Sequence, residues 1–144
     1  MTQMLVAVDG SKHSDKIVDY SCEFARKMSS TIILMFVSDF PSIISEYIDI
    51  GGVNPSPKGT RSVAGAERVT LKLREKIQAD GISHEVIFET GDPAEKIVSN
   101  AIEKKVDMIV IGLRGLHGVD RIRSLGSVAR KVIESSHCPV LVVT

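Results

Sequence analysis

The sequence has few cysteines, no net charge and no long apolar run, and each of these shortages excludes a class of protein. Cys22 and Cys138 are too few for a disulfide framework and do not form a CxxC pair. The formal net charge is +0, so no global field attracts nucleic acid or an anionic membrane. No apolar run approaches the roughly 20 residues that cross a bilayer. The first residues also lack the basic segment of a secretory signal. We therefore expect a cytoplasmic protein with reduced thiols that binds neither nucleic acid nor membrane.

Two familiar nucleotide fingerprints are missing as well. The chain has no GKS or GKT, as a Walker A loop requires, and no GxGxxG follows the first predicted strand. The four histidines fall on different predicted elements without ligand spacing, which argues against a histidine metal site. The sequence places no base beside a nucleophile, and we predict no catalytic residue.

What the sequence does contain is a regular alternation of strands and helices. The 144 residues, 43% hydrophobic and 25% charged, predict one globular domain over residues 1–144. Continuous apolar runs predict buried strands at Met4–Val8, Thr31–Val37, His84–Phe88, Val106–Ile111 and Val140–Val143. Only Phe40–Thr60, with three prolines, lacks this regularity; within it Ser42–Ile50 alone could form a short helix.

Apolar residues at helical spacing fill the stretches between these strands. Lys12–Met28 predicts the first helix, a second ends at Gly81, and a third begins at Pro93 with Asp92 as its cap and Glu95 near a capping box. The residues expected on the buried faces are Val18, Cys22, Ala25, Met28, Ala66, Thr70, Leu73, Ile77, Ile97, Val98, Ala101, Ile102, Val128, Ala129, Val132 and Ile133.

This order of elements predicts an α/β fold, an open doubly wound five-stranded parallel sheet of the Rossmann-like kind with helices on both faces. In strand order 3-2-1-4-5, the first and fourth strands are neighbours whose following helices lie on opposite faces. Ligands bind in the crevice that this arrangement leaves at the carboxyl ends. The sequence has its two most unusual turns there: Asp9-Gly10-Ser11 after the first strand, and Gly112-Leu113-Arg114-Gly115 after the fourth.

The residues of these turns suit different parts of a nucleotide. Gly112, Gly115 and Gly118 let backbone N–H groups converge on an anion, and Gly126-Ser127 opens a helix whose N-terminus favours phosphate. Positive charge in the same segment comes from Arg114, Arg121 and Arg123. Asp9, as an acceptor, suits a ribose hydroxyl or a metal-bound water. Each glycine alone is more often structural, and Asp9 could equally cap its own turn or the first helix.

The motifs together resemble the universal stress protein family. They are Val6-Ala7-Val8-Asp9-Gly10-Ser11, Gly112-x-x-Gly115, Leu125-Gly126-Ser127-Val128 and the closing Cys138–Val143. The resemblance to the ATP-binding branch implies adenine and ribose near Ala7, Asp9 and Val37 and phosphates along the glycine segment. The implied cofactor is ATP, or alternatively ADP or AMP, with Mg²⁺ that Asp9 could contact. The nucleotide-binding residues predicted in this way are Ala7, Val8, Asp9, Val37, Ile111, Gly112, Arg114, Gly115, Gly126, Ser127 and Val128.

One spacing departs from the family pattern Gly-x2-Gly-x9-Gly-Ser/Thr. Ten residues, Leu116 through Leu125, separate Gly115 from Gly126. Either Gly118 absorbs the additional residue in a bulge, or the loop no longer closes around a triphosphate.

The resemblance implies an ATP-binding regulatory protein of the stress response. A slow ATPase and an interaction module without nucleotide are the alternatives. The apolar C-terminal strand, Val140–Val143, ends the chain at a sheet edge, and in the resembling family this strand commonly pairs with its symmetry mate. A homodimer through this strand is therefore expected.

Overall fold

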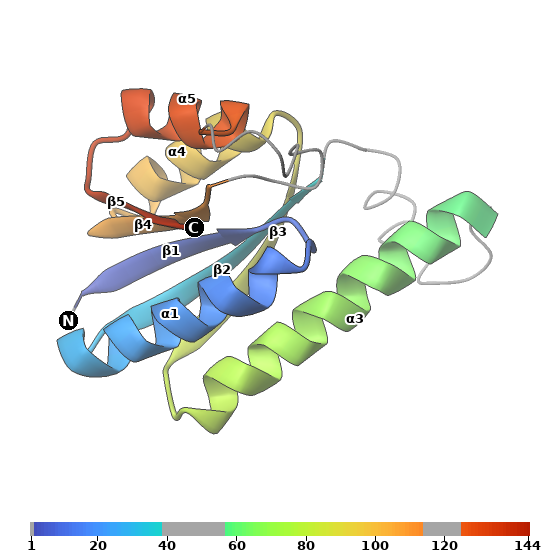
Figure 1. Ribbon diagram of the computed structural model, residues 1–144, viewed down its shortest axis with the longest axis horizontal. Helices are drawn as coiled ribbons and strands as arrows, with labels where there is room; N and C mark the ends of the chain where they lie inside the picture. Colours follow the sequence, from blue (N-terminus) through green and yellow to red (C-terminus); the bar gives the residue numbers. More distant parts are fainter. Residues whose placement is uncertain (1, 39–56, 114–124) are drawn as a thin grey trace.

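The computed structural model describes residues 2–38, 57–113 and 125–144, which form alternating strands and helices (Figure 1). The elements are β1 (Gln3–Val8), α1 (His13–Met28), β2 (Thr31–Ser38), α3 (Pro57–Ala79), β3 (His84–Thr90), α4 (Pro93–Glu103), β4 (Met108–Gly112), α5 (Ser127–Ser135) and β5 (Val140–Val143). Side chains of α3 are described from Arg68 onward. The five predicted strands are confirmed, with bounds that differ by at most two residues at either end.

The strands form one parallel sheet in the order β3-β2-β1-β4-β5, as predicted. Helices α1 and α3 cover one face of the sheet, and α4 and α5 cover the other (Figure 1). The central strand β1 is therefore buried on both faces, and this explains why its sequence is a continuous apolar run rather than an alternating one.

Two separate core clusters lie on the two faces of the sheet. The α1/α3 cluster is built around Met4, Val6, Val8, Ile17, Val18, Cys22, Ala25, Ile32, Leu34, Phe36, Leu73 and Ile77. The α4/α5 cluster is built around Leu5, Ala7, Ile33, Met35, Ala94, Ile97, Ala101, Ile109, Ile111, Ala129 and Val132. Successive residues of a strand point to opposite faces, so each strand contributes to both clusters.

Three helices end in the same way before the chain enters the next strand. The residues Ser29, Gly81 and Lys105 have φ of 52°, 69° and 54°, in the left-handed region. The N–H of the following residue then donates to a carbonyl five residues earlier in the chain, as in Ser30 to Ala25 at 2.9 Å. Only Gly81 adopts this conformation without strain from a Cβ atom.

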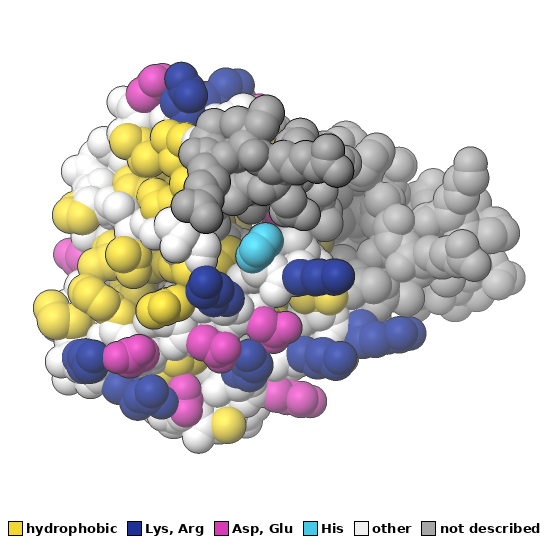
Figure 2. Space-filling view, in the orientation of Figure 1, with side chains coloured by type: hydrophobic (Ala, Val, Ile, Leu, Met, Phe, Trp, Pro, Cys, Tyr) yellow, Lys and Arg dark blue, Asp and Glu magenta, His cyan; other side chains and the backbone are white. Residues whose placement is uncertain are grey.

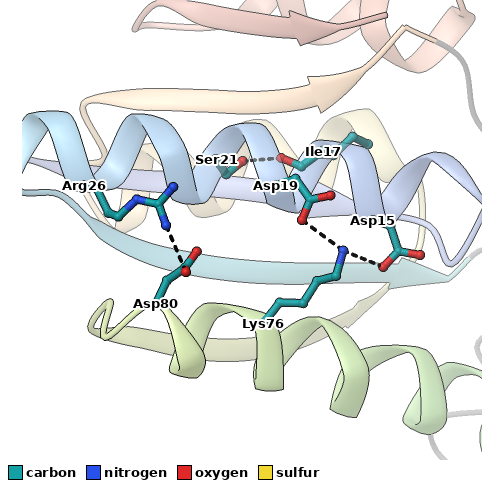
Figure 3. A network of polar contacts seen from close by, with 7 residues as sticks. All are labelled: Asp15, Ile17, Asp19, Ser21, Arg26, Lys76 and Asp80. Atoms are coloured by element: carbon teal, nitrogen blue, oxygen red, sulfur yellow. Dashed lines mark hydrogen bonds and ion pairs between the residues drawn. The ribbon is translucent and has the colours of Figure 1, made fainter.

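Ion pairs join α1 to α3 and to Asp80, the residue that follows α3, on the outside of the molecule (Figure 3). The Lys76 ammonium lies 3.2 Å from Asp15 and 2.9 Å from Asp19, and Arg26 lies 2.9 Å from Asp80. The hydrogen bond to Asp19 raises the pKa of Lys76. Asp15 and Asp19 are exposed, and both have the same partner on α3, the ammonium of Lys76.

Some sequence predictions need correction. Helix α3 begins at Pro57, so residues 57–60 are helical rather than part of the irregular stretch. The possible helix Ser42–Ile50 lies outside the described residues. Met28, Ile102 and Ile133 were expected on buried faces but are 51%, 54% and 43% exposed. The reason is that neighbouring elements cover a smaller part of each helix circumference than the part that carries apolar residues.

Among the residues described, no helix is long and apolar enough to cross a membrane.

Replacing Ser29 or Lys105 with glycine is expected to stabilise the fold by about 1 kcal/mol, because glycine removes the left-handed strain. Urea denaturation measures the change. Ser99→Gly, at an exposed position in the interior of α4, is the matched control and should cost about 0.5 kcal/mol. Destabilisation by all three changes would contradict the assignment of these helix ends.

The two thiols should differ in reactivity. Burial raises the pKa of Cys22 to about 11, which keeps the thiol protonated at neutral pH, whereas Cys138 is only partly buried. Since the thiolate is the nucleophile, iodoacetamide at pH 8 should label Cys138 in the native protein and Cys22 only in denaturant. Mass spectrometry distinguishes the two sites, and equal native labelling would show that Cys22 is not in the core.

Candidate functional site

The candidate site lies at the carboxyl ends of β1 and β4, where the sequence predicted it. Met4, Leu5 and Val6 of β1 pair with Met108, Ile109 and Val110 of β4 in parallel register. The turns that follow these two strands therefore leave the sheet at the same edge, and they lead into helices on opposite faces (Figure 1). This is the arrangement that opens a crevice in doubly wound sheets.

The turn after β1 is held by its own aspartate. The Asp9 carboxylate accepts a hydrogen bond from the Ser11 backbone N–H at 2.8 Å. Between them Gly10 has φ of 82°, a conformation that a residue with a Cβ atom adopts only under strain. The sequence left open whether Asp9 caps its turn or binds a ligand; its Oδ1 atom does cap the turn. Asp9 is partly exposed, so its carboxylate also borders the sheet edge.

The two ends of the glycine-rich segment are tied together by the backbone of Leu113. The N–H of Leu113 donates to the carbonyl of Val143, the last residue of β5, at 2.9 Å. The carbonyl of Leu113 accepts from the N–H of Gly126 at 2.9 Å. One residue therefore connects the end of the edge strand, the end of β4 and the start of α5.

The N-terminus of α5 is suited to an anion. Its N-cap is Gly126, which has no side chain to accept a bond from the first turn, and that turn holds no acidic residue. By contrast, Asp92 caps α4 through a 3.0 Å bond from the Glu95 N–H, as the sequence predicted. The first N–H groups of α5 have no acceptor within the helix, and the helix dipole adds positive potential there. Ser127 is exposed at this point.

Apolar side chains from several elements lie on the α4/α5 side of the sheet near this edge. Ala7 and Ile111 are buried in that cluster, and Val37 and Val128 pack against it while partly buried. Val8 differs from the other predicted residues, because its side chain belongs to the α1/α3 cluster on the opposite face. The structure therefore brings Ala7, Val37, Ile111 and Val128 into one layer and leaves only the backbone of Val8 near them.

Part of the predicted site lies outside the described residues. This is the case for Arg114 and Gly115, and also for Gly118, Arg121 and Arg123. Leu113 is the residue that the sequence did not single out. Its role is carried by the backbone, and only the register of β4 with β5, where Gly112 pairs with Val143, could have indicated it.

No protein-built metal centre accompanies these groups within residues 2–38, 57–113 and 125–144: no three His, Cys, Asp or Glu side chains are grouped to hold an ion. A carboxylate acceptor, an apolar wall and the N–H groups at the start of a helix with a glycine N-cap are a set that can bind a polar ligand with an apolar ring and an anionic tail. Asp9 would accept from hydroxyls, and α5 would donate to the anion.

Asp9→Asn keeps the oxygen that accepts from Ser11 and should leave the free energy of unfolding close to that of the original chain. Asp9→Ala removes the acceptor and should lower it by about 1 kcal/mol. Urea denaturation of the pair measures the difference. Equal stability of the two variants would show that the turn bond contributes nothing.

Comparison with known proteins gives a consistent result. A model of the universal stress protein family matches residues 1–144. Universal stress protein YxiE of Bacillus subtilis is 32% identical, over 98% of this chain and 97% of its own. The solved structure of the protein MJ0577 is 26% identical with a TM-score of 0.76, covering 99% of this chain and 94% of its own.

Two further solved structures share the fold and contain a nucleotide. A universal stress protein in complex with cAMP has a TM-score of 0.69 at 24% identity, covering 99% of this chain and 96% of its own. The universal stress protein of Archaeoglobus fulgidus in complex with dAMP has a TM-score of 0.70 at 22% identity, covering 100% and 98%.

Proposed function

This chain belongs to the universal stress protein family, and we propose that it binds an adenine nucleotide at the carboxyl ends of β1 and β4. The observation that carries the proposal is the placement of the α5 N-terminus, whose N-cap Gly126 makes no side-chain cap bond, and of the Asp9 turn at one sheet edge. The adenine would lie against Ala7, Val37 and Ile111, and the ribose hydroxyls would donate to Asp9.

The phosphates would lie at the start of α5 and along the glycine segment. The N–H of Gly126 already donates to Leu113, so the donors proposed for phosphate are the N–H groups of Ser127 and Val128 and the Ser127 hydroxyl. Gly112, Arg114 and Gly115 remain proposed contacts along the same path. The family members solved with cAMP and dAMP support an adenine nucleotide as the ligand class.

We propose ATP as the ligand, with ADP or AMP as the alternatives, and Mg²⁺ carried by the phosphates. Mg²⁺ is usually bound through one or two carboxylates together with the phosphates, so a lone carboxylate such as Asp9 fits that role. The function would be regulatory, with occupancy as the signal in a stress response, and the location cytoplasmic. No residue is assigned a catalytic role, and slow hydrolysis of ATP is a lesser alternative.

The chain is also proposed to associate with a second copy through β5. This strand is one of the two edges of the sheet and holds only Val140–Val143, a stretch without a charged residue or a proline to discourage pairing. Antiparallel pairing with the same strand of a second copy would give the backbone N–H and C=O groups on the outer side of β5 hydrogen-bond partners.

Ser127→Asp tests the nucleotide site without damaging the fold. A carboxylate in the first turn of α5 is favourable to the helix dipole, so stability should be kept or slightly raised. The same carboxylate would occupy the proposed phosphate position and repel the negatively charged phosphate. The affinity for Mg-ATP should therefore fall at least about tenfold. Isothermal titration of nucleotide-stripped protein with Mg-ATP, Mg-ADP and AMP measures both the affinity and the nucleotide preference.

Ser135→Asp is the matched control, because it makes the same exchange at the last residue of α5. It should leave the affinity unchanged. Equal affinity in Ser127→Asp and the original chain would place any bound nucleotide away from α5. Absence of binding in the original chain at millimolar concentration would favour the interaction module, with the ten-residue spacing as its cause.

A further inference from the structure

Glu89, near the end of β3, lies next to the apolar wall proposed for the adenine. In the parallel register of β2 with β3, Val37 pairs with Glu89. Neighbouring strands are about 4.8 Å apart, so the two residues are adjacent across the sheet. Ile87, two residues earlier on β3, packs against the α4/α5 cluster, as Val37 does. Because alternate residues of a strand share a face, the Glu89 side chain lies on the same side of the sheet as Val37.

Two residues of α4 hold the Glu89 carboxylate. The Asn100 side-chain amide, which is 7% exposed, donates to Glu89 Oε1 at 3.3 Å and to the Lys96 carbonyl at 2.9 Å. The Oε2 atom lies 3.8 Å from the Lys96 ammonium, an ion-pair distance that is longer than a hydrogen bond. The Glu89 side chain is still 33% exposed. One oxygen is therefore fixed by a buried amide, and the carboxylate keeps lone pairs that a ligand can use.

This setting differs from that of the ion pairs on the outside of the molecule. Figure 2 shows charged side chains of both signs over α1 and the described part of α3, where Lys76 pairs with Asp15 and Asp19. Such exposed pairs are well solvated and contribute little to stability. Glu89 instead extends from a strand toward α4, at the carboxyl edge of the sheet. A carboxylate that has lost part of its water there gains most from a hydrogen-bond donor on a ligand.

The strand order sets the direction in which the proposed nucleotide would lie. Its phosphates are proposed at the start of α5, its ribose at Asp9 after β1, and its base at Val37 on β2. The next strand in the sheet is β3. The edge of the base farthest from the ribose therefore points toward β3, and in adenine this edge carries the amino group on C6. A carboxylate accepts hydrogen bonds and this amino group donates them, so the two are complementary.

We propose that Glu89 is the base-selecting residue of the site, and that its carboxylate accepts a hydrogen bond from the amino group of adenine. The inference rests on the proposed nucleotide site and adds to it a contact from β3, a strand that supplies none of the other proposed contacts. A purine without the amino group lacks this bond. A purine with a carbonyl at C6 brings oxygen lone pairs toward those of the carboxylate and should be disfavoured.

The test uses two nucleotides that differ only in the amino group, ATP and purine riboside triphosphate, both with Mg²⁺. Glu89→Ala should lower the affinity for Mg-ATP about tenfold, because a charge-assisted hydrogen bond is lost. It should leave the affinity for purine riboside triphosphate unchanged. Isothermal titration of nucleotide-stripped protein measures the four affinities, and thermal unfolding verifies that the variant is folded.

Glu85→Ala is the matched control. Glu85 lies on the same face of β3 and also pairs with a lysine of α4, since its carboxylate is 2.6 Å from the Lys104 ammonium. It pairs in register with Ile33, four residues before Val37, and is therefore away from the carboxyl edge. Both variants remove one negative charge, and any long-range effect on the phosphates acts equally on the two nucleotides. Glu85→Ala should leave the ratio of the two affinities unchanged.

The results separate the role of Glu89 from the existence of the nucleotide site. If the original chain binds neither nucleotide, the proposed function fails and the inference fails with it. If the original chain binds both, and Glu89→Ala weakens them equally or not at all, the nucleotide site stands and the base-selecting role of Glu89 is overturned. Tighter binding of Mg-GTP than of Mg-ATP by the original chain would also overturn it, because guanine has a carbonyl in place of that amino group.

Discussion

Parallel pairing of β1 with β4 brings together two segments that are distant along the chain, and the candidate site exists only because of it. The pairing requires a crossover between the two halves of the sheet, and this places α1 and α5 on opposite faces. The turn before each helix then opens at one edge. Asp9 supplies an acceptor from one side, and the first turn of α5 supplies donors from the other. Without this register, the two turns would not meet at one edge of the sheet.

Leu113 gives the site a physical connection to the sheet edge. Its N–H and carbonyl bond to Val143 and Gly126, so the start of α5 and the end of β5 are fixed to the same peptide unit. A change in position at either end would strain a 2.9 Å hydrogen bond at the other. The proposed nucleotide contacts and the proposed self-association surface are thus neighbours in the backbone, although their side chains lie on different parts of the molecule.

The sequence was sufficient for the strands, their order and the Asp92 cap, since each depends on local patterns or on the strong rules for parallel sheets. It was not sufficient for features set by packing across elements. Met28 and Ile102 follow the helical period, yet they lie outside the narrow arcs that neighbouring elements cover. The layer to which Val8 points and the bonds of Leu113 depend on register, which composition and spacing do not encode.

The most direct test of the central claim is a titration of the ¹⁵N-labelled protein with Mg-ATP, followed by backbone amide chemical shifts. The account predicts the largest changes at Gly10 and Ser11 after β1 and at Ser127 and Val128 at the start of α5, with little change on the outer surface of α3. Saturable shifts confined to other elements, or no shifts at millimolar nucleotide, would contradict a nucleotide site between β1 and β4.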